Sequence, residues 1–210
     1  MDYQIDPGAS RFTIRAFASG MLSGMGHNPT FIARDLGGQV TFDSQNPDSA
    51  AVRFRVGSAS LTLVDSVSER DRREIERVTS QEVLESSVHP EILYEAARIA
   101  VAGGGAPLQA TVDGTLTLHG VSRPLQVVVR VYPDGTMLRA QGEVALRQAD
   151  YRIAPVSVAG GMLKVKDEVK LAFDLVARQV PAAEAGGAGS AERRSDDDRT
   201  QERTEAAGTR

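Results

Sequence analysis

The sequence predicts an all-β fold: a closed antiparallel barrel of about eight strands with one or two short helices, one of them alongside the barrel. Apolar and polar residues alternate with a period of two through most of the first 180 residues. Short turns containing Gly or Pro separate the alternating segments, which makes neighbouring strands antiparallel. One charged helical segment is too small to cover a sheet of that size, so we expect the sheet to bury its apolar face by closing on itself.

Composition limits both the domain organisation and the class of partner. The 210 residues are 41% hydrophobic, enough for one domain, which we place at residues 1–180. Lys and Arg total 24 against 28 Asp and Glu, and the net charge of -4 argues against a nucleic-acid partner. The absence of cysteine excludes disulfides and thiolate metal sites. Residues 181–210 contain no Val, Ile, Leu, Met or aromatic residue, so we expect a disordered, polar and charged tail.

Targeting signals are not evident in the sequence. The first residues lack the basic and apolar stretches of a secretory signal, so the expectation is a cytoplasmic protein. No apolar run approaches the roughly 18 residues of a membrane-spanning helix, and stable membrane insertion is not expected. The sequence leaves open whether the chain forms a homodimer.

Three alternating segments in the first half are typical of strands with one buried face. Their apolar positions are Phe12, Ile14 and Ala16, then Val40 and Phe42, then Val52, Phe54 and Val56. The parity of the apolar positions switches within residues 58–63 and again within residues 94–101. Such switches predict β-bulges or strands that cross a rim.

The charge-rich segment 65–84 predicts the helix. Either Ser66 or Ser68 is suited to be its N-cap. Thr79 and Glu82 have the spacing of a capping box, which predicts a second short helical turn. We expect the helix to be exposed.

Four longer alternating segments fill the second half. Their apolar positions are Leu108, Ala110, Val112, Leu116 and Leu118; Leu125, Val127, Val129 and Val131; Leu138, Ala140, Val144 and Leu146; and Leu163, Val165, Val169, Leu171, Phe173 and Leu175. His119-Gly120 and Pro133-Asp134-Gly135 separate adjacent segments, and both predict hairpin turns.

The inward faces contain many small side chains. Ala16, Ala110, Gly114, Ala140 and Gly142 lie at inward positions, and the chain has no Trp. The interior is therefore expected to be underfilled, which predicts an apolar cavity in a barrel of this size. A flattened sandwich would remove the gap by bringing two sheets together, and this alternative stays open.

Several stretches resemble the YceI-like family. They are Tyr3-Gln4-Ile5-Asp6-Pro7, Gly38–Asp43, Asp71–Ile75, His89–Ile92 and, most specifically, Leu116–Pro124. The resemblance covers roughly residues 2–178. It implies a lipocalin-like extended barrel with a helix alongside. Arg152 stands where the family usually has Gly, and residues 20–29 differ from the common form of the first hairpin.

The resemblance also implies a function, because characterised YceI-like proteins bind long apolar chains in the barrel lumen. We expect non-catalytic binding, carriage or sequestration of an isoprenoid or lipid of the quinone, polyprenyl or fatty-acid type, with no cofactor unless that ligand is an isoprenoid quinone. The candidate interior residues are Phe12, Ile14, Phe42, Phe54, Leu116, Leu118, Val144, Leu146 and Phe173. The candidate mouth residues are Met21, Met25, His27, Phe31, Tyr151 and Met162.

Catalytic and metal chemistry are not indicated by the sequence. His27, His89 and His119 have no paired metal-ligand spacing, and we expect no metal site. No nucleophile elbow is present, and the chain is expected not to be an enzyme. Two other hypotheses stay open: an enzyme that uses His27 or Tyr151 for proton transfer, and a filled scaffold whose helix or tail recruits a partner.

Overall fold

The computed structural model describes residues 1–19, 28–43, 45–46, 49–102, 107–154, 156–158 and 163–181. Residues Met1–Val180 form one compact unit. Apart from Pro181, the predicted tail lies outside the described residues, so its expected disorder stays a prediction. No helix within the described ranges is long and apolar enough to cross a lipid bilayer.

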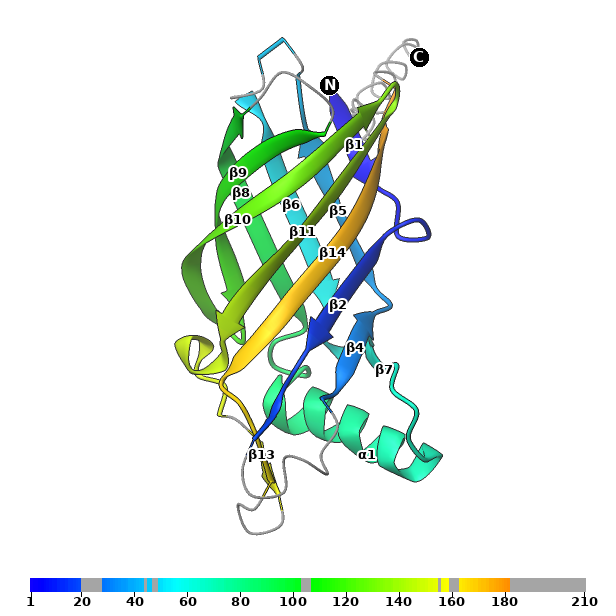
Figure 1. The fold of residues 1–210 in the computed structure, drawn as a ribbon, viewed down its shortest axis with the longest axis vertical. Helices are drawn as coiled ribbons and strands as arrows, with labels where there is room; N and C mark the ends of the chain where they lie inside the picture. Colours follow the sequence, from blue (N-terminus) through cyan, green and yellow to red (C-terminus); the bar gives the residue numbers. More distant parts are fainter. Residues whose placement is uncertain are drawn as a thin grey trace, which may run out of the picture. The chain divides into compact units, whose positions relative to one another are not determined.

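The described part of the chain is mostly strands, with one α-helix and short helical turns (Figure 1). The strands are β1 (Asp2–Ile5), β2 (Arg11–Arg15), β3 (Ala18–Ser19), β4 (Thr30–Ala33), β5 (Leu36–Thr41), β6 (Ala51–Gly57), β7 (Leu61–Leu63), β8 (Glu91–Ala102), β9 (Leu108–Leu118), β10 (Val121–Asp134), β11 (Met137–Arg147), β12 (Ser157–Val158), β13 (Leu163–Val165) and β14 (Glu168–Gln179). The helical elements are η2 (Ser58–Ser60), α1 (Glu69–Val78), η3 (Thr79–Val83) and η4 (Gln148–Tyr151).

A ring of antiparallel strands closes the barrel. The strand order is β1-β5-β6-β8-β9-β10-β11-β14, and β1 pairs with β14 to complete the ring of eight. The predicted fold class is therefore confirmed. Closure leaves no edge within this ring, which is how an antiparallel sheet of this size buries one face without a covering layer.

Strand β14 belongs to both the ring and an extension of the sheet. Its last residues pair with β1, and its earlier residues 170–174 pair with β2. From there β4 and β7 continue the sheet toward α1 (Figure 1). A smaller sheet of β12, β13 and β3 lies at the same end of the barrel as α1.

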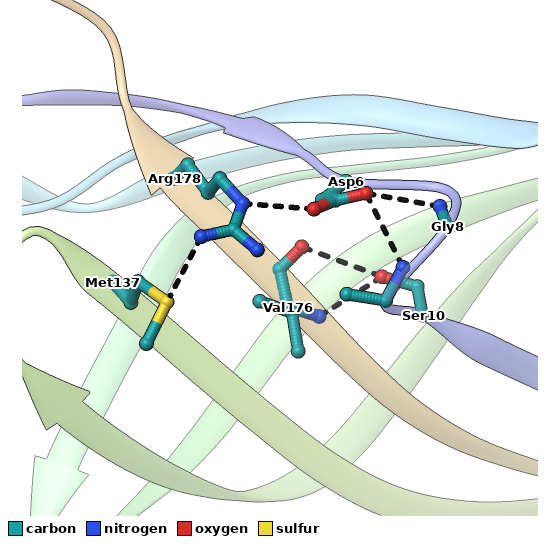
Figure 2. A network of polar contacts seen from close by, with 7 residues as sticks. Asp6, Gly8, Ser10, Met137, Val176 and Arg178 are labelled. Atoms are coloured by element: carbon teal, nitrogen blue, oxygen red, sulfur yellow. Dashed lines mark hydrogen bonds and ion pairs between the residues drawn. The ribbon is translucent and has the colours of Figure 1, made fainter.

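A short turn lets the chain leave β1 and re-enter the sheet as β2 (Figure 2). Asp6 holds the turn, because its Oδ1 accepts from the backbone N–H of Gly8 at 2.9 Å and its Oδ2 accepts from Arg178 Nε at 2.8 Å. Ser10 Oγ then accepts from Val176 N at 2.9 Å and donates to Val176 O. The Ser10 side chain thus bonds to the backbone of β14 at the point where the chain has left β1 and has not yet begun β2.

The helix is shorter than the charged segment from which it was predicted. It starts at Glu69, and Ser68 is its N-cap, with Oγ accepting from Asp71 N at 3.2 Å. The second turn exists as the π-helical turn η3, but its predicted capping box is wrong. Thr79 continues in the α conformation without a side-chain cap, and Glu82 pairs with Arg77 at 2.9 Å instead.

Both predicted irregularities and both predicted hairpins occur. The turn η2 separates β6 from β7, and the register between β8 and β9 shifts between Ala96 and Arg98. His119-Gly120 connects β9 to β10 with positive φ at both residues, as a tight hairpin requires. The turn between β10 and β11 consists of Gly135 and Thr136, one residue later than predicted, because Asp134 still pairs with Met137.

Candidate ligand cavity

The inward faces of the strands enclose a cavity of about 830 Å³. That volume lies within the usual range for sites that bury a small molecule. The lining is overwhelmingly aliphatic and aromatic. On β9 it extends from Leu108 to Leu118, roughly 33 Å along the strand at about 3.3 Å per residue. With a strand tilt of roughly 40°, this corresponds to about 25 Å along the barrel axis, so the lumen is elongated.

All described residues of the predicted interior set line the cavity. They are Phe12, Ile14, Phe42, Phe54, Leu116, Leu118, Val144, Leu146 and Phe173. Phe31, predicted for the mouth, lines the cavity as well. This placement follows from the period of two, because alternate side chains on each strand point into the ring. Whether these residues contact a ligand remains a prediction.

The other residues predicted for the mouth stay a prediction. Met21, Met25, His27 and Met162 lie outside the described residues. Tyr151 is described: it is buried in the turn η4 and packs in the same hydrophobic core as Leu146, but it is not among the residues that line the cavity. Burial also raises the pKa of the Tyr151 phenol, with nearby Asp150 adding to the shift.

The inward glycines do not add empty space. A Cβ on Gly114 would lie 2.5 Å from the ring of Tyr94, and a Cβ on Gly142 would lie 2.5 Å from Phe173 Cζ. Each glycine therefore accommodates an aromatic ring from the adjacent strand. The predicted cavity exists, but the glycines in that argument were wrongly counted as unfilled positions.

Tyr94 is a lining residue that the sequence did not indicate, since it lies where the apolar parity switches. Its hydroxyl lies 3.1 Å from the carbonyl oxygens of both Val112 and Leu125, so its proton is donated to the barrel wall. Burial, with a smaller effect of Asp113, raises its pKa to about 12. Tyr94 thus presents mainly its ring to the cavity.

Phe12 and Phe54 are in contact inside the barrel. Their ring centroids are 5.5 Å apart with planes tilted by 46°, although β2 and β6 are not paired strands. This aromatic pair is a contact between two strands that are not hydrogen-bonded to each other, of a kind that stabilises beyond simple area burial.

Polar lining residues gather at the end of the cavity where α1 lies. They include Asp65, Ser66, Asp71, Glu74, Thr79, Gln148 and Lys164. Ile75 and Val78 of α1 also line the cavity, so the helix is exposed on one side only. At the opposite end the described lining is apolar, for example Phe42, Leu138 and Ala177. The cavity is therefore amphipathic along its length.

Carboxylates dominate the charge at the polar end. Asp65 Oδ2 accepts from the backbone N–H of Thr30 at 2.7 Å. Glu74 pairs with Arg77 at 2.8 Å, and this arginine lowers the pKa of the glutamate. Lys164 is the lone basic residue among the described lining residues. The lining at this end thus carries more carboxylates than basic side chains, and the guanidinium of Arg72 lies beside it, donating to the Asp65 carbonyl at 3.0 Å.

The sequence interpretation of the histidines needs a correction. His89 and His119 lack a paired ligand spacing in the sequence, yet their ring centroids lie 4.6 Å apart. Glu85 joins them, with Oε2 2.7 Å from His119 Nε2. Two signals in the sequence could have revealed this contact. One is the spacing of four between Glu85 and His89. The other is that His89 lies just before β8 and His119 just after β9, its antiparallel partner. None of the three residues lines the cavity.

The fold and the cavity define a class of protein: a closed antiparallel β-barrel that encloses an elongated, apolar cavity with polar lining residues at one end. The model of the YceI-like domain matches residues 3–177 of this chain. The chain belongs to the YceI-like family, which confirms the resemblance found in the sequence.

Curated relatives match over part of the chain. A UPF0312 protein of Ectopseudomonas mendocina is 27% identical over 135 residues, and one of Pseudomonas fluorescens is 29% identical over 137 residues. In both cases the match covers 64% of this chain and 64% of the relative. The chain thus spans just under two thirds of the length of these relatives.

Solved structures share the fold at low sequence identity. Burkholderia cenocepacia BcnA is 20% identical, with a TM-score of 0.65 over 82% of this chain and 98% of that one. A polyisoprenoid binding domain from Saccharophagus degradans, implicated in plant cell wall breakdown, is 14% identical, with a TM-score of 0.59 over 85% and 98%. Identities this low support a common architecture and carry no assignment of ligand.

Proposed function

We propose that this protein binds the hydrocarbon chain of an isoprenoid or related lipid in the barrel lumen, for carriage or sequestration rather than chemical conversion. The observation that carries the proposal is the elongated cavity of about 830 Å³ with an almost entirely apolar wall. The structural neighbour described as a polyisoprenoid binding domain supports this ligand class through its fold.

The amphipathic cavity favours one orientation of such a ligand. Its hydrocarbon chain lies along the apolar wall toward Phe42 and Ala177, and its polar head lies near α1. Because Asp65 and Glu74 line that end, an uncharged head such as a quinone or an alcohol fits better than a phosphate or a fatty-acid carboxylate.

Binding without catalysis agrees with the way the described lining groups are used. The Tyr94 hydroxyl is committed to backbone carbonyls, and Glu74 is committed to Arg77. Gln148 donates to the carbonyl of Lys166 at 2.9 Å. Each of these three side chains therefore makes a structural contact within the protein. No two of them are placed to act as the acid and the base on one ligand.

Moderate affinity is expected from the balance of burial and association. A chain that buries about 400 Å² gains about 10 kcal/mol at about 25 cal/mol per Å². Association costs of roughly 4–15 kcal/mol offset most of that gain, so the dissociation constant is expected near the micromolar range.

Native mass spectrometry tests the proposal. The protein is incubated with an isoprenoid quinone and with the same headgroup lacking its isoprenoid tail. We expect a single adduct with the tailed compound alone, because the tail supplies the buried area. A bare mass with every isoprenoid and lipid offered would contradict the proposal.

Neighbouring residues on β10 provide a matched pair of variants. Val127 lines the cavity and is buried, whereas Val128 is 50% exposed on the outer face. Val127→Trp fills part of the lumen and is expected to weaken quinone binding at least tenfold. Val128→Trp adds the same side chain outside the barrel and is expected to change affinity less than twofold. Equal effects of the two variants would show that the ligand does not occupy the lumen.

A further inference from the structure

The strand pairing brings three potential metal ligands to one end of the barrel. Strand β8 pairs with β9 so that Leu93 lies opposite Thr117. The residues just before β8 and just after β9 therefore meet, and these are His89 and His119. Glu85 belongs to the same loop as His89, and its carbonyl accepts from His89 N at 2.9 Å. This tight turn places the Glu85 and His89 side chains together.

The donor atoms of this cluster lie close enough to share one ion. One ligand atom from each of Glu85, His89 and His119 lies within 4.8 Å of the other two. The Glu85 Oε2 to His119 Nε2 separation is 2.7 Å. Ligands at about 2.0–2.2 Å from a tetrahedral ion lie roughly 3.4 Å apart, so modest side-chain rotation completes the geometry. The Glu85 side chain is 51% exposed, which gives it freedom to rotate and gives an ion a route from solvent.

A backbone carbonyl orients His119 as a metal ligand would need. Its Nδ1 lies 3.3 Å from the carbonyl oxygen of Tyr151 in η4, so Nδ1 is the protonated nitrogen when this hydrogen bond forms. Nε2 then faces Glu85 Oε2 at 2.7 Å, and it can offer its lone pair to an ion that displaces the hydrogen held between these two atoms. Histidines that bind metals through one nitrogen commonly donate the other N–H to a carbonyl in this way.

The local backbone is built around the two rings. A Cβ on Gly120 would lie 2.8 Å from His89 Cε1, so a glycine is required beside the second histidine. Glu85 and His119 both have positive φ, at 45° and 51°. Non-glycine residues in this conformation are uncommon, and they concentrate at functional sites and tight turns.

We propose that Glu85, His89 and His119 bind a divalent transition-metal ion, with Zn²⁺ as the probe, and leave one coordination position open. Two imidazoles and one carboxylate suit zinc and its neighbours in the first transition row, whereas calcium and magnesium prefer oxygen ligands alone. The ion takes the place of the proton now shared between Glu85 and His119. It would connect the loop after η3, the β9–β10 hairpin and, through Tyr151, the turn η4.

The alternative is a hydrogen-bond network without an ion. In that case His119 connects Glu85 to the Tyr151 carbonyl and needs no metal. The two explanations predict different results with zinc. Only a metal site binds zinc with these three side chains and makes the thermal stability of the protein depend on zinc. Because the three residues do not line the cavity, the zinc result is also independent of lipid binding.

Zinc binding is measured on the full chain after removal of metals by a chelator. Zinc chloride is titrated in competition with a chromophoric zinc indicator. The wild type is expected to bind one equivalent, and His119→Asn is expected to weaken binding at least tenfold. Asparagine keeps a donor near the Nδ1 position for the Tyr151 carbonyl and removes Nε2, so it separates metal binding from the orienting hydrogen bond. His89→Ala is expected to have a comparable effect.

The control replaces the acidic run Asp196, Asp197 and Asp198 by asparagine, because that run is another anionic cluster in the sequence. It is expected to leave the affinity of the single site within twofold of the wild type. If the wild type binds no zinc at micromolar concentrations, or if His119→Asn and His89→Ala bind it as well as the wild type does, the proposal is wrong.

Thermal unfolding provides a second, independent readout. At free zinc a hundredfold above the dissociation constant, the wild-type Tm is expected to rise by roughly 5–10 °C, because zinc binds the folded state. In His119→Asn the Tm without zinc serves as the baseline, whatever its value, and zinc is expected not to raise it. An equal rise in the variant would also overturn the proposal.

Discussion

The two ends of the cavity differ in what builds them and in what they can recognise. The wall away from α1 is made by regular, paired strands whose inward side chains are apolar. The end near α1 is made by a helix, turns and short strands, and it contributes the acids Asp65, Asp71 and Glu74. Such an arrangement separates two tasks: the strand wall supplies binding free energy in proportion to buried area, and the helix end discriminates between headgroups.

The largest effect is expected from truncating the aromatic contact between Phe12 of β2 and Phe54 of β6. Phe12→Ala removes the partner of Phe54 and is expected to cost about 3 kcal/mol, at the lower end for such changes because the site already borders a cavity. The Tm should fall by roughly 6–12 °C in thermal unfolding monitored by circular dichroism. Val128→Ala, on the exposed outer face, serves as the control and should change Tm by about 1 °C or less. A change in Tm as small as that of the control would show that the contact between Phe12 and Phe54 contributes little to the stability of the barrel.

A smaller effect is expected from the charge of the ligand head. An isoprenoid quinone should bind about tenfold more tightly than a prenyl phosphate with the same tail, a difference of about 1.4 kcal/mol, because carboxylates outnumber Lys164 at the helix end. Competition titration measures both affinities. Replacing Asp71 by Asn and Glu74 by Gln should reduce the ratio of the quinone affinity to the prenyl phosphate affinity. Equal affinities of the wild type for the quinone and the prenyl phosphate would show that the helix end does not discriminate between neutral and anionic headgroups.

Local stability of the helix end is tested by its N-cap. Ser68→Ala removes the acceptor for Asp71 N and is expected to cost α1 about 1 kcal/mol. Hydrogen exchange should quicken about fivefold in the α1 amides while the β9 and β10 amides keep their protection. Ser66→Ala is the matched control, since Ser66 was the other N-cap candidate. Equal exchange in both variants would contradict the assignment of the cap.

The smallest effect concerns acid stability of the strand wall. The Arg178 guanidinium lowers the pKa of Asp6, and the Arg139 guanidinium lowers the pKa of Asp174. A carboxyl whose folded pKa is lowered stabilises the fold above its ordinary value of about 4, and this contribution is lost as the pH falls through the lower, folded value.

Urea denaturation at a series of pH values from neutral to acid measures this contribution. The wild-type midpoint should fall as the pH drops below about 4, and Asp6→Asn with Asp174→Asn should flatten that dependence. The arginine of each pair is more than half exposed, so water and salt screen the pair, and the change should be modest and smaller at high salt. An unchanged slope in the double variant would show that these ion pairs do not contribute.

The strand wall could be predicted closely from the sequence, whereas the helix end could not. Leu116 and Leu118 were placed inward because each strand has a period of two, and this local rule holds wherever one face is buried. The positions of Tyr151 and of the Glu85, His89 and His119 cluster depend on where turns and loops pack. No periodicity governs those contacts, so the sequence did not indicate that His89 and His119 meet.

The sequence by itself determined the alternating faces, the hairpins, the helix and the apolar character of the interior, because each depends on residues close together in the chain. Tertiary structure alone decided which glycines Tyr94 and Phe173 fill, which end of the cavity is acidic, and which side chains meet at Glu85. These outcomes depend on strand register and closure, which join residues far apart in sequence and fix distances that local patterning does not encode.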